Sequence, residues 1–404
     1  MSRRALIVTI AAASILMITT GARQSLGLFV SPLNTATGLG ITTISFAYAV
    51  AQLMWGVAQP FAGGVADRYG PSRVLVGGVA VLAIGMALTP FMRTGAGLVL
   101  SLGLLAAIGS GAASFSVLIG AASRHLTPEG RGKSSGIINA GASFGQFVFA
   151  PITQALIQGI GWMGAMWSLA GIMLASLPLV RVVDAPVAMP HGTSAAALAP
   201  AQPWRAVREA MRDPSYLLLH AGFFTCGFHI AFLVTHLPGE VGLCGLPASV
   251  ASLSLALIGL SNIVGSVLAG AGTARYRSKH ILALMYGSRA VLIGCYMMAP
   301  KTEWTFYLFA VGLGITWLAT VPPTATIVGK LFGVRYLATL FGLTLLSHQV
   351  GAFFGAYLGG IALARTGSYT WMWYADMALA AAAAVVNLPI REARVVPVAQ
   401  PASA

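Results

Sequence analysis

The sequence is poor in charge, and poorest in acidic residues. Of its 404 residues only 9 are Asp or Glu and 23 are Lys or Arg, so charged residues make up 8% of the chain. Apolar residues make up 57%, and the mean hydropathy is +0.83. A water-soluble domain carries about 25% charged residues, because water must solvate its surface. The composition therefore excludes a soluble globule and indicates a chain that crosses a membrane many times.

Cysteine and reactive motifs are scarce as well. Cys226, Cys244 and Cys295 are an odd number, two of them inside apolar stretches, so no disulfide framework is expected. The sequence contains no metal-ligand spacing, phosphate loop or nucleophile–base arrangement, and we expect neither an enzyme nor a cofactor. The net charge of +14 does not indicate a nucleic-acid partner, because the basic residues stand in short loops between apolar runs.

Twelve stretches are apolar over the roughly 20 residues that a helix needs to cross a bilayer. They are residues 5–30, 42–63, 74–92, 97–123, 134–158, 164–180, 214–237, 248–271, 281–299, 304–328, 336–364 and 369–388. The polar segment after the sixth stretch predicts a linker with a short amphipathic helix at 204–211 on the membrane surface. The predicted domains are residues 1–181, the linker 182–213, residues 214–394 and a tail, 395–404.

The basic residues also predict the orientation. If the N-terminus is cytoplasmic, the inner loops hold eighteen Lys and Arg residues, whereas the outer loops hold three: Arg93, Lys301 and Arg365. Cytoplasmic loops carry the excess of basic residues in membrane proteins. We therefore expect both termini and the linker in the cytoplasm, and the chain in the lipid bilayer of the inner (plasma) membrane.

A short polar loop separates the second and third stretches. Residues 63–73 read Gly-Gly-Val-Ala-Asp-Arg-Tyr-Gly-Pro-Ser-Arg, and such a sequence cannot lie in hydrocarbon. The spacing of Gly64, Asp67, Arg68, Gly70 and Arg73 resembles the loop between helices 2 and 3 of the major facilitator superfamily. The resemblance implies a latch that holds one access state, in which the Asp accepts hydrogen bonds at a helix end and the basic residues bridge to neighbouring helices. The plain alternative is a polar turn.

Six spans, a linker and six further spans match the two-half plan of this superfamily. The resemblance implies an all-α polytopic membrane protein with twelve transmembrane helices in two six-helix bundles, the major facilitator fold. We expect a monomer.

Two arginines lie within spans. A charged side chain in hydrocarbon costs at least about 2.5 kcal/mol and is a functional candidate by default. Arg23 stands in the outer half of the first span, and no span of the N-terminal half contains an Asp or Glu outside the loop at 63–73. An unpaired guanidinium attracts an anion, so Arg23 is predicted to bind an anionic substrate. The alternative is that it reaches the outer rim or bonds to helix carbonyls.

Arg289 lies in the middle of the ninth span, and Asp376 is the only carboxylate deep in any span. Arg289 is a candidate substrate ligand, although helix 9 is an outer support in the superfamily plan. An ion pair between Arg289 and Asp376 is an equal alternative, because buried charges are usually paired.

Neutral polar residues supply further candidates. His348 and Gln349 lie at the centre of the eleventh span, where a histidine can titrate or donate to an anion. Further polar residues within spans are weaker candidates, because a hydrogen bond between helices would explain the presence of each of them. They are Gln24, Gln52, Gln59, Asn139, His229, Asn262 and Trp317.

The tract Arg23-Gln24-Ser25, followed by residues 29–32 (Phe-Val-Ser-Pro), is similar to helix 1 of the monocarboxylate transporter and oxalate/formate antiporter branch. That resemblance implies a secondary transporter that moves a small organic anion, a monocarboxylate, by alternating access. The chain departs from the branch in the eighth span, where Ser261, Asn262 and Gly265 replace an acid-plus-arginine pair. A coupling proton would therefore have to use histidine or the substrate itself. The alternatives are a multidrug exporter and a non-transporting membrane receptor.

Overall fold

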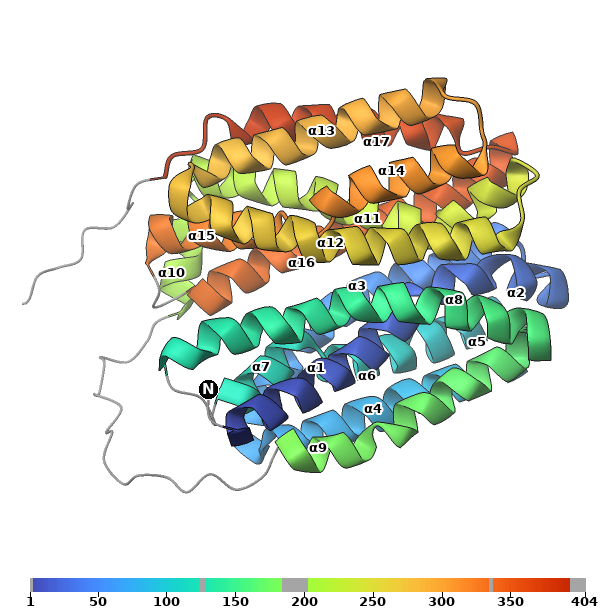
Figure 1. Cartoon of the computed structure of the whole chain (residues 1–404), viewed down its shortest axis with the longest axis horizontal. Coiled ribbons are helices and arrows are strands. Elements are labelled where there is room, and N and C mark those ends of the chain that lie inside the picture. The colour runs from blue at the N-terminus through green and yellow to red at the C-terminus, as the bar shows by residue number, and fades with distance from the viewer. Residues whose placement is uncertain (1–2, 124–127, 184–202, 334–336, 393–404) are drawn as a thin grey trace, which may run out of the picture.

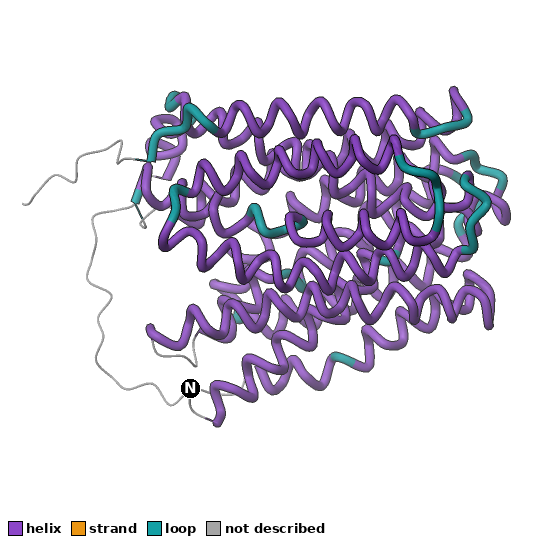
Figure 2. The backbone as a smooth tube through the Cα atoms, turned by 45° about the horizontal axis from the view of Figure 1, so that its top comes forward, coloured by secondary structure: helices purple, strands orange, loops and turns teal. Residues whose placement is uncertain are grey.

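The computed structural model describes residues 3–123, 128–183, 203–333 and 337–392. Within these residues all regular structure is helical, and the helices form two bundles that lie side by side (Figure 1). The loops gather mainly at the two ends of the bundles (Figure 2). We call the end at which α1 and α10 begin the terminus side and the opposite end the far side.

The N-terminal bundle contains the first six crossings. The first is α1 (Arg3–Gln24), η1 (Leu26–Phe29) and α2 (Val30–Thr37); the second is α3 (Ile41–Tyr69); the third is α4 (Pro71–Leu88) with η2 (Thr89–Phe91). The fourth is α5 (Gly95–Leu98), η3 (Val99–Ala106), α6 (Ala107–Ala112) and α7 (Phe115–Ser123). Finally α8 (Pro128–Ala175) and α9 (Leu177–Val183) supply two crossings, because Gly161 turns the chain back with φ 76°. Glycine suits this turn, since other residues rarely adopt a positive φ.

The C-terminal bundle follows a short helix, α10 (Pro203–Ala210). Its crossings are α11 (Pro214–Leu243), α12 (Ala248–Arg275), α13 (Ser278–Met298), the broken pair α14 (Glu303–Thr316) and α15 (Val321–Phe332), α16 (Leu337–Thr366) and α17 (Thr370–Asn387). Asp213 caps the N-terminus of α11. Its Oδ1 accepts hydrogen bonds from the backbone N–H groups of Ser215 (2.8 Å) and Tyr216 (3.2 Å), and Pro214 occupies the first helical turn.

The predicted fold class is confirmed. Nine described segments are long and apolar enough to cross a membrane, and one of them, Gly136–Val183, contains the Gly161 turn. With α16 and α17 they correspond to the twelve predicted stretches. The amphipathic helix predicted at 204–211 is α10, whereas most of the linker and the tail 395–404 lie outside the described residues. The domain boundaries stay a prediction.

Small residues let helices of one bundle approach closely. A Cβ atom at Gly351 or Gly355 of α16 would overlap a backbone carbonyl of α11. Gly141 and Gly145 of α8 meet α1 in the same way. These glycines recur every four residues, so each helix presents a groove along one face.

The two bundles touch on the far side and at mid-height. Gly27 of η1 meets the carbonyl oxygen of Val234 on α11, and Gly56 of α3 meets the side chain of Gln349 on α16. Asn262 of α12 donates a hydrogen bond to the Ser143 hydroxyl of α8 at 2.8 Å. These contacts join α3 to α16, α8 to α12 and the first crossing to α11.

The bundles diverge toward the terminus side. Gly63, Gly136 and Gly342 lie seven residues, or about two helical turns, from Gly56, Ser143 and Gln349 on the same helices, and so on the same faces. Among the described residues, no atom beyond the glycine's chain neighbours and the nearby backbone of its own helix lies within 4 Å of the Cβ position of any of these three glycines. The structure is therefore closed between the bundles on the far side and open on the terminus side.

Candidate substrate site between the bundles

The first crossing breaks directly after Arg23. Helix α1 ends at Gln24, and the next residues form the 3-10 turn η1. The Ser25 hydroxyl donates to the carbonyl of Gly21 (2.9 Å), and the Tyr48 hydroxyl of α3 donates to that of Leu26 (2.8 Å), so side chains satisfy carbonyls near the break. Arg23 thus stands in the last turn of α1, where the helix dipole favours a cation.

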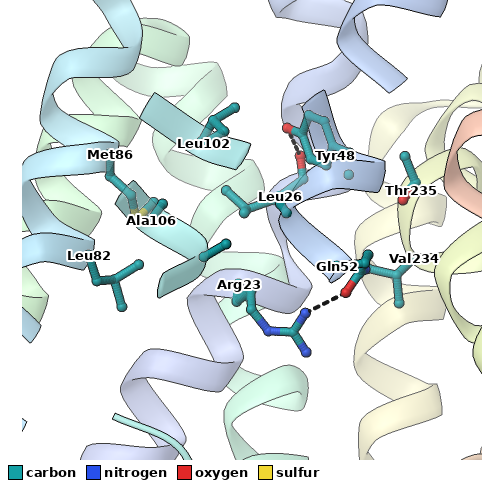
Figure 3. A pocket seen from close by; sticks show the side chains of 13 residues that line it. Arg23, Leu26, Tyr48, Gln52, Leu82, Met86, Leu102, Ala106, Val234 and Thr235 are labelled. Carbon is teal, nitrogen blue, oxygen red and sulfur yellow. Dashed lines mark hydrogen bonds between the residues drawn. The ribbon is translucent and has the colours of Figure 1, made fainter. Parts of the chain in front are cut away.

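Arg23 is held by two neutral residues of α3. Its Nη1 donates a hydrogen bond to Gln52 Oε1 at 2.8 Å (Figure 3). Its Cζ atom lies 4.1 Å from the centroid of the Trp55 ring. The Nε atom is buried and has no hydrogen-bond partner among the described residues. A cation over an indole face gains about 0.5 to 2 kcal/mol, which fixes the guanidinium without neutralising it.

The guanidinium has no acidic partner in the described part of the chain. Ion pairs of this part include His229 with Asp376, Lys330 with Glu392 and Arg391 with Asp213, which lie in the C-terminal half. Arg23 borders an interior cavity instead of the outer rim of the protein.

This cavity lies between the bundles and is small. Its residues come from α1, η1, α3, α4, η3 and α6, and from Val234 and Thr235 of α11 in the other bundle. The volume is about 30 Å³, which is room for one or two water molecules. A ligand of several atoms would enter only if the bundles moved apart around Arg23.

His348 and Gln349 bring α16 to the same level. Gln349 packs on Gly56, one helical turn from Gln52, and its Nε2 lies 3.1 Å from His348 Nδ1. His348 also stacks near Phe223, with ring centroids 5.1 Å apart. The structure therefore brings Gln349 next to the α3 face that holds Arg23, whereas the His348 ring lies against Phe223 of α11 within the C-terminal bundle.

Several buried polar atoms around this level have no partner among the described residues. They are Arg23 Nε, Gln24 Oε1, His348 Nε2 and Gln349 Oε1. Buried polar groups are nearly always hydrogen-bonded, to protein or to water, so unpaired ones require an explanation. A polar ligand or bound water between the bundles would satisfy them.

One alternative for Arg289 was an ion pair with Asp376, and the structure does not contain this pair. Its Nη2 donates to the carbonyl oxygens of Thr316 and Trp317 (2.6 Å for Trp317), and its Nε to the Thr316 hydroxyl at 3.2 Å. The acceptors stand where α14 ends, and an arginine there satisfies carbonyls that the broken helix leaves free. Asp376 instead contacts His229, at 2.5 Å.

Other predicted contacts have placements that packing explains. Asn262 accepts hydrogen bonds from the backbone N–H of Leu318 (2.9 Å) and from Ser266 (3.3 Å), besides its bond to Ser143. Trp317 is fully buried in the C-terminal bundle. Asn139 is half-buried on α8, one turn from Ser143. Their role as substrate contacts stays a prediction.

The predicted latch lies at the turn between α3 and α4. Gly64 and Arg68 stand in the last turns of α3, Gly70 makes the turn with φ 93°, and Arg73 follows in α4. Arg68 and Arg73 are exposed, and the Arg68 Cζ atom lies 5.3 Å from the Tyr69 ring. The side chain of Asp67 lies outside the described part, so the latch stays a prediction.

The sequence prediction missed two residues of the site. Gln52 was one of several weak candidates, and neither Tyr48 nor Trp55 was singled out. Their spacing carried the signal, because residues 48, 52 and 55 share one helix face at intervals of four and three. This polar and aromatic stripe on an apolar span faces the break in the first crossing.

Comparison with known sequences gives matches over most of the chain. The model of the Major Facilitator Superfamily matches residues 12–356. Monocarboxylate transporter 13 of Rattus norvegicus is 25% identical over 381 residues, covering 91% of this chain and 85% of the relative. The oxalate:formate antiporter of Oxalobacter formigenes is 21% identical over 352 residues, covering 87% and 82%. The resemblance predicted from the sequence is confirmed.

Solved structures match in fold. The crystal structure of a D-xylose–proton symporter superposes with a TM-score of 0.75 at 13% identity, covering 96% of this chain and 98% of the other. A bacterial homologue of the human lysosomal transporter Spinster, crystallised inward-facing and unoccupied, gives a TM-score of 0.71 at 16% identity and covers 96% and 95%. At such identities the likeness concerns the fold alone.

Proposed function

Because this chain belongs to the major facilitator superfamily, and so is a multi-pass membrane transporter, we propose that it moves a small organic anion, a monocarboxylate, by alternating access. The relatives named for monocarboxylate and oxalate:formate transport support this substrate class. The residues around Arg23 supply a chemical reason for it.

The observation that carries the proposal is a guanidinium without a counter-ion. Arg23 is held in the interior by the Gln52 amide and the Trp55 ring, and its Nε has no partner. A carboxylate would gain charge-assisted hydrogen bonds from such a group, roughly twice as strong as neutral ones. A cationic drug would be repelled by it.

The C-terminal bundle contributes His348 and Gln349 to the proposed site. Each carries a buried polar atom without a partner, and Gln349 already touches α3. Arg289 is left out of the site, since helix carbonyls occupy its donors. Substrate would therefore bind between one charged residue of α1 and two polar residues of α16.

Transport requires the protein to open on the far side and close on the terminus side, and then to return to the present arrangement. If both termini lie in the cytoplasm of a cell whose inner membrane holds the protein, as the basic loops predict, the present arrangement faces inward. The cavity beside Arg23, about 30 Å³, is then a contracted form of the site without room for substrate. The loop at Gly64–Arg73 would act as the latch of one state.

The test is counterflow in proteoliposomes with radiolabelled formate, oxalate and L-lactate. We expect exchange of at least one of them by the wild type, and a loss of about 10- to 100-fold in Arg23→Gln, because a hydrogen bond to a charged group contributes about 1.5 to 3 kcal/mol. Arg23→Lys keeps the charge and should retain part of the rate.

Arg93→Gln is the matched control, since Arg93 is an exposed arginine on the far side of the same bundle. It removes the same charge and should leave exchange unchanged. Wild-type exchange by Arg23→Gln, with normal insertion, would rule out the anion site. Exchange of none of the three anions by the wild type would rule out the substrate class.

A further inference from the structure

A histidine and an aspartate form an isolated pair inside the C-terminal bundle. His229 of α11 and Asp376 of α17 approach to 2.5 Å between Nδ1 and Oδ2, and their side chains are 1% and 0% exposed. Neither residue borders the cavity beside Arg23. The pair is therefore a second buried ionisable site that substrate binding at Arg23 does not use.

The pair sits in an apolar and aromatic environment. Three residues along each helix toward the far side, Phe232 and Trp373 pack with ring centroids 5.0 Å apart. The Trp317 ring lies 6.1 Å from that of His229. An ionised carboxylate in such surroundings costs several kcal/mol unless it is neutralised, and a proton on the pair neutralises it.

Half of the pair's hydrogen-bonding capacity is unused. His229 Nε2 and Asp376 Oδ1 are both buried and have no partner in the described part of the structure. A pair that serves only to hold two helices together would be expected to satisfy these atoms, because partly satisfied buried polar groups are destabilising. The free nitrogen and oxygen are positions at which a proton or a water can arrive and leave.

Other ionisable groups lie on the helices that pack around the pair. On the terminus side, the packed helices carry Cys226, Tyr286, Arg289 and His348, and Arg289 directs its donors to the carbonyls of Thr316 and Trp317. Toward the far side they carry His236, Tyr296 and Tyr369, and the His236 ring is bound by the Ala356 carbonyl and the Tyr369 hydroxyl. Arg289 is the one cation of this group that is always charged.

The pair is also linked to the interface between the bundles. Gly227 stands two residues before His229, about 3 Å along the axis of α11, and its Cα packs directly on the backbone of His348. His229 further contacts Trp317, which lies in the break between α14 and α15. A shift of α16 or of this break during the change of access state would alter the surroundings of the pair.

We infer that His229 and Asp376 form a proton-binding site inside the C-terminal bundle, which holds a proton in one access state and releases it in the other. Its role as the coupling site rests on the proposed function, since the proton would move with the anion bound at Arg23. Proton binding itself can be measured without any substrate.

The first test follows the imidazole nitrogens of the wild-type protein in nanodiscs. The chain has seven histidines, so ¹⁵N-histidine NMR spectra remain tractable. The signals lost in His229→Gln are those of His229, and Asp376→Asn should shift the same signals because it replaces the carboxylate that contacts this ring. We expect the His229 signals to change reversibly with pH over the range in which the protein stays folded, and to change differently in Asp376→Asn. His229 signals that stay constant over this range would overturn the inference.

The second test measures coupling with radiolabelled oxalate in proteoliposomes that are alkaline inside by one pH unit. The membrane potential is clamped at zero, because an oxalate dianion and one proton together carry a net negative charge. If one proton moves with each anion, the wild type should accumulate oxalate about tenfold, because equal free energies give equal concentration ratios. His229→Gln should abolish the accumulation yet retain oxalate counterflow, and protein-free liposomes correct for passive entry. His280→Gln is the control, since His280 lies at the terminus-side start of α13.

The outcomes separate the two proposals. Wild-type counterflow without any effect of His229→Gln on accumulation would overturn the coupling site and leave the anion carrier intact. Absence of counterflow in the wild type would overturn the proposed function, while the NMR titration would still decide whether the pair binds a proton.

Discussion

Two arginines lie within the spans of this protein, each near an aromatic ring, and their hydrogen-bond partners differ. Arg289 is fully buried and donates to two backbone carbonyls and the Thr316 hydroxyl. Arg23 is half-buried and has one amide oxygen and one aromatic ring as partners, with an unpaired Nε. A guanidinium has five donors, so the first arginine is largely satisfied within the protein and the second is open to a ligand.

The difference follows from where each arginine stands relative to a broken helix. Arg289 reaches from α13 to the break between α14 and α15, inside one bundle, where free carbonyls accept its hydrogen bonds. Arg23 precedes the break of its own helix, at the interface of the two bundles, where Ser25 and Tyr48 already satisfy nearby carbonyls. Two arginines within spans can thus have different surroundings, and unused hydrogen-bonding capacity at the interface of the bundles is what makes Arg23 the candidate for binding.

Replacing each arginine by methionine is the strongest test of this contrast. Arg289→Met removes the donor to the Thr316 carbonyl and leaves the Trp317 carbonyl with the weak Cys226 Sγ donor alone, at 3.8 Å. An unsatisfied buried polar group costs about 1 to 3 kcal/mol. We expect its thermal midpoint in detergent to fall by about 5 to 10 °C. Arg23→Met removes a cation that has no acidic partner, so its midpoint should stay unchanged or rise.

Transport should change in the opposite sense. Arg23→Met should insert and fold normally and lose anion exchange, whereas any Arg289→Met protein that folds should keep a measurable rate. Equal losses of stability in the two variants would contradict the distinction between a structural and a binding arginine.

The second prediction concerns Gly27, in the break that follows Arg23. A Cβ atom there would overlap the carbonyl oxygen of Val234, and a backbone atom cannot move aside as a flexible side chain can. Gly27→Ala should therefore separate the bundles on the far side, at a cost of about 1 to 3 kcal/mol to the present arrangement. The population should shift toward a state that is open on the far side.

Spin labels on the far side would measure this shift. Ala36 of α2 and Ala248 of α12 are exposed and belong to different bundles, and the more accessible Cys244 and Cys295 can be replaced by Ser while the buried Cys226 is kept. The distance between labels at 36 and 248 should lengthen in Gly27→Ala. Gly171→Ala is the control, because open space surrounds Gly171. Identical distance distributions in both variants would show that Gly27 does not control closure.

Sequence reasoning predicted the fold well, because hydropathy, loop charge and the polar loop at 63–73 all depend on local composition. It also singled out Arg23, since the absence of acids from the first six spans can be counted. It could not choose a partner for Arg289, because carbonyls freed by a break at 317–320 are invisible until the break is seen. The pairing of His229 with Asp376 joins residues 147 positions apart. No local sequence pattern around either residue indicates the other as its partner.

The smallest expected effect belongs to the aromatic partner of Arg23. Trp55→Leu keeps an apolar side chain on α3 but removes the ring face, whose attraction for the guanidinium is about 0.5 to 2 kcal/mol. Gln52 would then hold Arg23 alone, so we expect the apparent affinity for the transported anion to fall by a few-fold with little change in maximal rate. Trp304→Leu, at an exposed tryptophan of α14, should change neither. Because the ring orients the cation without neutralising it, a loss as large as that of Arg23→Gln would mean that Trp55 itself contacts the substrate.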